Sequence, residues 1–192
     1  MATGSAAVSV AKPLTGSGGI FVAPAGTTVP TSYDEALDAA FVKMGYISED
    51  GVTRTEDADS DDKFAWGGDA VADLPGQHSI TYAATFLESG NADLLKALYG
   101  EEAVSVDATS GEVTITGTSK RPPRSVYVIE TDVLREVIPI GQLNRSGDVQ
   151  YVDSEVIQYE ASIKAYPDAD GAKYFTYRKG DGSTSGESGG EG

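Results

Sequence analysis

The sequence lacks cysteine altogether, so neither disulfide bonds nor thiolate chemistry is available to it. It has a single histidine, His78, which excludes any site that needs two imidazoles. Cations are also scarce, with 14 Lys and Arg against 30 Asp and Glu and a formal net charge of −16. This balance disfavours binding to a nucleic-acid backbone or to an anionic membrane, because both need clustered positive charge.

Long apolar runs are absent as well. No segment approaches the ~20 apolar residues that span a bilayer, so no membrane contact is predicted. No basic segment followed by an apolar one opens the chain, so no signal peptide is expected.

Glycine, by contrast, is abundant, with 23 residues in a chain of 192 that also has 8 prolines. Residues 1–19 are small and Gly-rich, which predicts a flexible N-terminal arm. Residues 180–192 contain only Gly, Ser, Thr, Asp and Glu, which predicts a disordered tail. A single β-domain is therefore expected over residues 20–179.

The clearest local pattern lies in residues 78–100. Residues 80, 82, 84 and 86 put Ile, Tyr, Ala and Phe on one face, a period of two that predicts a half-buried strand. Asn91 then offers an N-cap, and three leucines follow at helical spacing before Gly100. A short helix at about residues 90–99 is predicted, and its leucine face must lie on a sheet because so short a helix is not stable alone.

Turn-separated segments with strand patterns run through the rest of the chain. They include residues 20–22, 41–47, 103–106, 112–117, 124–131, 134–143, 156–166 and 173–177. Residues 48–55 are predicted to form a hairpin about Asp50-Gly51, residues 33–40 a helical turn or two, and Pro139 an edge or bulge. The predicted fold is mainly β: an antiparallel β-sandwich or barrel of about eight or nine strands with one flanking α-helix.

An acidic stretch at residues 49–72 is interpreted as a long loop. Asp57, Asp59 and Asp61 have the alternate spacing of a calcium loop, but Asp62 and Gly68 occupy the positions where that loop needs Gly and Glu. A solvated acidic loop is therefore preferred over a metal site. Phe64 and Trp66, near its end, are expected to share one face of a strand.

Catalytic and cofactor signatures are missing. His78 begins a strand with no nucleophile or carboxylate motif beside it, and the Gly-rich stretch at 16–19 lacks the Lys and Ser or Thr of a phosphate loop. No enzyme activity, cofactor or metal site is predicted.

Some residues remain candidates for contacts between subunits. The cations at 120–124 surround two prolines. They are interpreted as a solvated loop, as a mate for acidic residues of a neighbour or, on a weaker signal, as a nucleic-acid site. Trp66, beside two glycines, is either a packing anchor or an interface residue. The full candidate set is Asp57, Asp59, Asp61, Asp62, Phe64, Trp66, Lys120, Arg121 and Arg124.

Three parts of the chain carry a family resemblance. The first is Val42–Thr53 followed by an acidic stretch and Ala65–Gly68; the second is Tyr82–Gly100; the third is Gly147–Tyr151 with Tyr159–Gly171. In pattern and order they resemble the major tail proteins, or tail tube proteins, of long-tailed bacteriophages, nearest to those of phages that infect actinobacteria.

The resemblance implies a structural protein whose subunits form hexameric rings that stack into a tube. It implies partners in the tape-measure, tail-terminator and distal tail proteins, a place in the virion tail, and assembly in the host cytoplasm. DNA would pass through the lumen without specific binding. The alternative is a virion decoration or adhesion β-domain that binds protein or glycan.

Overall fold

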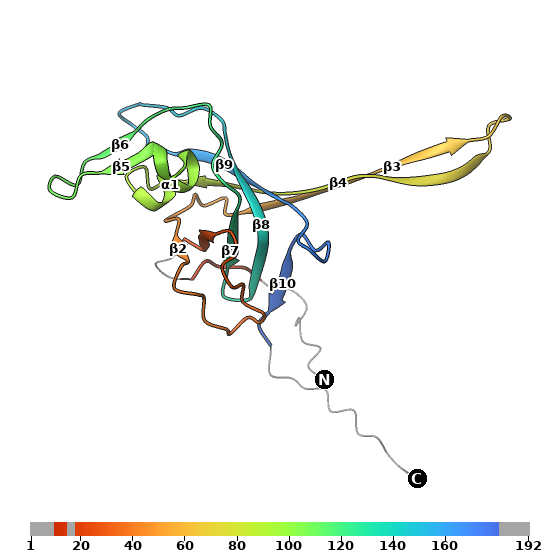
Figure 1. Cartoon of the computed structure of the whole chain (residues 1–192), viewed down its shortest axis with the longest axis horizontal. Helices are drawn as coiled ribbons and strands as arrows, with labels where there is room; N and C mark the ends of the chain where they lie inside the picture. The colour runs from red at the N-terminus through yellow and green to blue at the C-terminus, as the bar shows by residue number, and fades with distance from the viewer. Residues whose placement is uncertain (1–9, 15–17, 181–192) are drawn as a thin grey trace, which may run out of the picture.

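The computed structural model describes residues 10–14 and 18–180 (Figure 1). Most of the predicted arm and the predicted tail, residues 1–9, 15–17 and 181–192, lie outside the described part. The strands are β1 (Ile20–Pro24), β2 (Val42–Lys43), β3 (Thr53–Phe64), β4 (Ala70–Phe86), β5 (Val104–Val106), β6 (Val113–Ile115), β7 (Ser125–Glu130), β8 (Leu134–Ser146), β9 (Tyr159–Ala165) and β10 (Phe175–Arg178). The helical elements are α1 (Ala92–Tyr99) and a single 3-10 turn, η1 (Glu101–Ala103).

Eight of these strands form one antiparallel sheet in the order β2-β1-β7-β8-β9-β4-β3, with β10 also paired to β8. β5 and β6 pair separately, and they lie in the predicted strand segments 103–106 and 112–117. The mainly β prediction with one flanking α-helix is confirmed, and the described residues contain ten strands rather than eight or nine.

β8 joins two halves of this sheet. Its N-terminal part pairs with β7 and β10, and from Gly141 onward it pairs with β9. The register shifts opposite Pro139, between Ser125 and Tyr127, which confirms the bulge predicted from this proline. A bend here lets β9 and β4 cross β7 and β8, so the sheet folds over on itself (Figure 1).

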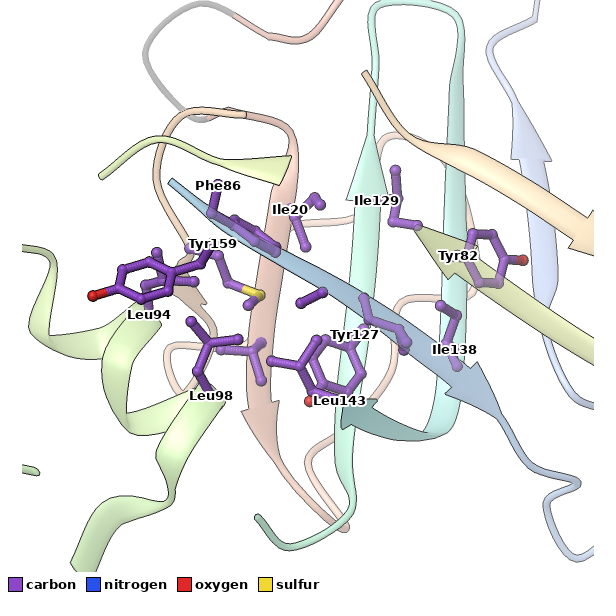
Figure 2. Packing of buried hydrophobic residues seen from close by; sticks show 14 of the residues in the cluster. Ile20, Tyr82, Phe86, Leu94, Leu98, Tyr127, Ile129, Ile138, Leu143 and Tyr159 are labelled. Atoms are coloured by element: carbon purple, nitrogen blue, oxygen red, sulfur yellow. The ribbon is translucent and has the colours of Figure 1, made fainter. Parts of the chain in front are cut away.

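The main core lies between the two halves. Ile20 of β1, Tyr127 of β7 and Leu143 of β8 pack there with Tyr82 of β4 and Ile163 of β9. Figure 2 shows these strands' side chains converging with the leucines of the helix. The buried residues of this cluster are Ile20, Val22, Met44, Ile80, Tyr82, Phe86, Leu94, Leu95, Leu98, Val104, Tyr127, Ile129, Ile138, Leu143, Tyr159, Ala161, Ile163 and Ala165.

A second, smaller cluster covers the other face of β1, β7 and β8. Phe21, Val128 and Val137 are buried there under apolar side chains of the 29–41 segment and of β10. β1 and β7 are therefore buried on both faces, which explains their nearly continuous apolar sequence.

α1 closes one end of the core as predicted. The side chain of Asn91 accepts hydrogen bonds from the backbone N–H groups of Asp93 and Leu94, at 3.0 and 3.2 Å. Leu94, Leu95 and Leu98 are buried, and Gly100 ends the helix with a φ of 98°. The strand-then-helix pattern of residues 78–100 thus corresponds to the C-terminal half of β4 followed by α1.

Four local predictions are wrong. Residues 33–40 form bends and turns rather than a helix. The flanks of Asp50-Gly51 do not pair with each other, because Ile47 and Thr53 each pair with β4, opposite Phe86 and Ala83. Residues 49–72 are not a loop, because most of them belong to β3 and β4. Phe64 and Trp66 do not share a strand face, because Trp66 lies in the turn between these strands.

Candidate assembly surfaces

The most prominent surface is the β3–β4 hairpin, which projects far beyond the rest of the molecule (Figure 1). Its strands have 12 and 17 residues and pair antiparallel along their length, with a register shift between Ala58 and Ser60. Its tip is closed by hydrogen bonds from Ala65 N to Asp69 O (2.8 Å) and from Gly68 N to Ala65 O (3.0 Å). An isolated two-stranded ribbon is marginally stable, so the projecting part gains little from the core.

The hairpin carries most of the predicted contact residues. Asp57, Asp59 and Asp62 are exposed on β3, and Trp66 is 106% exposed at the tip. Asp61 and Phe64 also belong to β3, but their side chains lie outside the described part.

Polar contacts at the base of the hairpin fasten it to the body and join its two strands to each other. Arg54 Nη1 lies 2.7 Å from Glu136 Oε1 of β8, and its guanidinium stacks over Tyr174 at 4.8 Å. His78 Nε2 lies 2.8 Å from Glu56 Oε1, and Lys173 donates to the backbone oxygen of His78. These contacts set the direction in which the ribbon leaves the sheet, so His78 has a structural position and not the surroundings of a catalytic base.

The predicted cations lie at the opposite end of the molecule, beside α1, β5 and β6 (Figure 1). Lys120 donates a hydrogen bond to the side chain of Glu102 and forms an ion pair with it. The hydrogen bond, and then the positive charge of Lys120, hold the pKa of Glu102 below its usual range. Arg124 stacks over the ring of Tyr166 at 4.0 Å, and Pro122 O accepts a hydrogen bond from Gln142 Nε2 at 2.8 Å. The structure therefore does not bring these cations to the acidic hairpin of the same chain.

A polar face covers the outer side of β8, β9, β4 and β3, opposite the main core. Cross-strand partners share a face, so the register of the strands defines the rows of this face. The rows are Gln142–Lys164–Thr81–Thr55, Asn144–Ser162–Ala83–Thr53 and Ser146–Glu160–Thr85. Small uncharged side chains dominate these rows. The sequence alternation identified such faces, but which strands adjoin one another could not be deduced from it.

The buried titratable groups are structural. Burial raises the pKa of both the Tyr82 and the Tyr127 phenol, since the charged form would lie among apolar side chains. Arg135 and Glu130 form a buried ion pair with Nη2 and Oε1 2.5 Å apart. Arg135 also donates from Nη1 to Ser32 O at 3.0 Å and to Glu35 O at 2.5 Å. It therefore anchors the start of the 33–40 segment, which was predicted to form a helical turn or two.

Among the side chains that the structure describes, no three His, Asp or Glu are grouped so that they could hold a metal ion. No helix in the described part of the chain is long and apolar enough to cross a bilayer. The described surface thus has a projecting ribbon, an opposite end with the predicted cations, and a polar sheet face.

Comparison with known sequences gives the class. The profile of the phage tail tube protein family matches residues 1–186, so the chain belongs to the phage tail tube protein family. It is a structural component of a virion tail, not an enzyme. No curated protein matches the sequence.

One solved structure that the search matches is the cap of the anti-feeding prophage, described as the AFP tube terminating cap. It has 8% sequence identity and a TM-score of 0.38, and the match covers 93% of this chain and 100% of that one.

Proposed function

We propose that this chain is the repeating subunit of a phage tail tube, in which copies form rings, hexameric as the family resemblance implies, that stack around a channel for DNA. The observation that carries this proposal is the projecting hairpin. The outer edge of β3 is unpaired, and Trp66 at the tip is fully exposed. Within the described part of the chain, nothing covers either feature. Contacts between copies would bury both features, and head-to-tail contacts of this kind close into rings.

The polar face of β8, β9, β4 and β3 is the best candidate for the channel wall. It lies opposite the core, and the rows defined above contain one cation, Lys164, against Glu160. With so few cations it offers little to hold a phosphate backbone, so DNA would slide past it. The net charge of −16 acts in the same direction by repelling DNA from the subunit as a whole.

This function implies further partners and a setting. The tube would assemble in the cytoplasm of the bacterial host along a tape-measure protein, and its ends would contact tail-terminator and distal tail proteins. The resemblance of residues 42–53, 82–100 and 159–171 favours a phage that infects actinobacteria.

Negative-stain electron microscopy of the purified chain tests the proposal, since no catalytic assay applies. Rings or tubes of uniform diameter are expected as concentration rises. Particles that remain monomeric at every concentration, and that bind a glycan or another virion protein, would instead support the decoration or adhesion domain.

A further inference from the structure

The hairpin tip has the properties of an inserting group. Trp66 is the single tryptophan of the chain, and its side chain is 106% exposed. Gly67 and Gly68, with φ of 128° and 95°, let the turn stay narrow around it. An indole buries a large apolar area at little conformational cost, and so it serves as an anchor when a partner offers a matching hollow.

A hollow of suitable character lies at the other end of the molecule. It has a volume of about 470 Å³ and lies between the C-terminal end of α1 with η1 and the segment before β7. Tyr99 and Pro123 supply apolar walls, while Gly100 and Ala103 contribute small floor residues. Lys120 and Arg121 lie among its lining residues and are exposed. The hollow is large enough for one indole. Its guanidinium and ammonium groups could interact favourably with the face of an inserted aromatic ring.

The acidic tip could meet cations at the hollow, although the lining of the hollow as a whole, with Glu101 and Glu102 against Lys120 and Arg121, has no net charge. Near the tip, Asp59, Asp62 and Asp69 are exposed, with Lys63 as the nearby cation. Around the hollow, Glu101 and Glu102 are already paired with Lys96 and Lys120. Arg121 and Arg124 have no ion pair with a carboxylate in the described part of the chain, and so they remain to meet the acids of another copy.

A larger groove, of about 970 Å³, fits the tip less well. It lies at the base of the hairpin and is bordered by the exposed carboxylates of Glu49 and Asp50. Carboxylates there would repel the acidic tip. The hollow beside α1 is therefore the better acceptor.

We propose that the hairpin tip of one copy inserts Trp66 into the hollow between α1 and Pro123 of a second copy. Tip and hollow lie at opposite ends of the long axis (Figure 1), so each copy donates at one end and accepts at the other. Such a heterologous contact can repeat from copy to copy without exhausting its surfaces. The inference rests on the proposed function, because it names the surface that receives the projecting ribbon.

Site-directed disulfides test the contact in the full chain, which has no native cysteine to interfere. One batch carries Ala65→Cys, next to Trp66 at the exposed tip; a second carries Thr118→Cys, an exposed residue of the hollow. The batches carry tags of different mass, are mixed and assembled, and are then oxidised mildly. A disulfide needs the two Cα atoms within about 7 Å, so only a true tip-in-hollow contact should give the mixed dimer on a non-reducing gel. Ala65→Cys mixed with Ala169→Cys, at an exposed turn elsewhere, is the control.

The expected result is a mixed dimer for residues 65 and 118 in most of the assembled chain, and little or none for 65 and 169. Tubes that form normally without the 65–118 dimer, or with equal crosslinking to residue 169, overturn the inference and leave the proposed function standing. Wild-type chain that forms neither rings nor tubes overturns the proposed function itself, and the inference with it.

Discussion

Gly141 is the residue at which β8 passes from one half of the sheet to the other. A Cβ atom there would lie 2.5 Å from Cδ2 of Tyr127 and 2.9 Å from Cγ2 of Ile163, both core side chains. The glycine therefore makes room for the tightest part of the core, at the bend on which the fold depends.

Gly141→Val should consequently destabilise the monomer by about 1–3 kcal/mol, because rings and strands on both sides must shift to admit the new atoms. Urea unfolding measures the loss. Gly117→Ala is the matched control, since nothing lies within 4 Å of a Cβ at that position. Equal stability of the Gly141 variant and the wild type would contradict the packing described for β7, β8 and β9.

The buried phenol of Tyr127 makes the stability of the same core depend on pH. Burial raises the pKa of its phenol above the value of about 10 that applies in the unfolded chain. A raised pKa means that the folded state holds the proton more tightly, so the associated stability is complete below pH ~10 and is lost as pH rises further.

Tyr127→Phe should therefore reduce the fall in the free energy of unfolding between about pH 9 and 11, while the wild type loses stability steeply over this range. Denaturant titrations at several pH values provide the measurement. Tyr151→Phe, at a ring 76% exposed, should follow the wild-type curve. Identical pH profiles for all three proteins would show that ionisation of Tyr127 does not limit alkaline stability.

At the scale of elements, the 31–35 segment depends on one side chain of β8. Arg135 is buried, pairs with Glu130 and donates to the backbone oxygens of Ser32 and Glu35. The more exposed pair Arg54–Glu136, with side chains 37% and 12% exposed, offers a comparison within the same molecule.

Arg135→Met should cost about 3–5 kcal/mol, because it leaves Glu130 buried without a counter-charge and frees two backbone acceptors. Arg54→Met should cost about 1 kcal/mol or less, since solvent compensates for a partly exposed pair. Thermal and urea unfolding of both variants give the comparison. Should the two losses be equal, Arg135 would not be the anchor that its contacts indicate.

The elements that the sequence predicts well are those stabilised by local pattern. The alternation at residues 80–86, the Asn91 cap and the leucines of α1 all lie within a few residues of one another, and the structure confirms them. Residues 33–40 have helix formers, yet the distant Arg135 holds their backbone in bends. Such long-range contacts are invisible in a local pattern.

The sequence did not predict the acidic β3–β4 hairpin, for a related reason. Its apolar content is too low to signal a strand, and an acidic run normally remains solvated. The strand forms because its partner is provided by β4, which continues unbroken from the core, so cross-strand hydrogen bonds extend the ladder outward. The candidate contact residues were chosen for their charge and aromatic character, and their role in contacts between copies stays a prediction. Their placement at opposite ends of the molecule depends on the whole topology.

At the scale of the whole molecule, assembly and stability should respond to different residues. Trp66 is fully exposed, so Trp66→Ala should change the melting temperature of the monomer very little, within the ±0.5 kcal/mol usual for surface positions. It should nonetheless raise the concentration at which tubes form by tenfold or more, because an anchoring indole is lost from every contact. Sedimentation velocity of the wild type, Trp66→Ala and Trp66→Phe measures this effect, and the Phe variant should be intermediate. Normal assembly of the Ala variant would show that Trp66 does not contribute to the interface.

The central claim, that the projecting hairpin is a contact between copies, is tested most directly by hydrogen exchange on the monomer and on the assembled tube. In the monomer, amides of β3 at its outer edge and those of residues 65–69 should exchange rapidly, since only one edge of the ribbon is paired. In the tube we predict strong protection of residues 53–69, with the exposed turn at 167–171 unchanged as an internal reference. Equal exchange of residues 53–69 in monomer and tube would contradict the account.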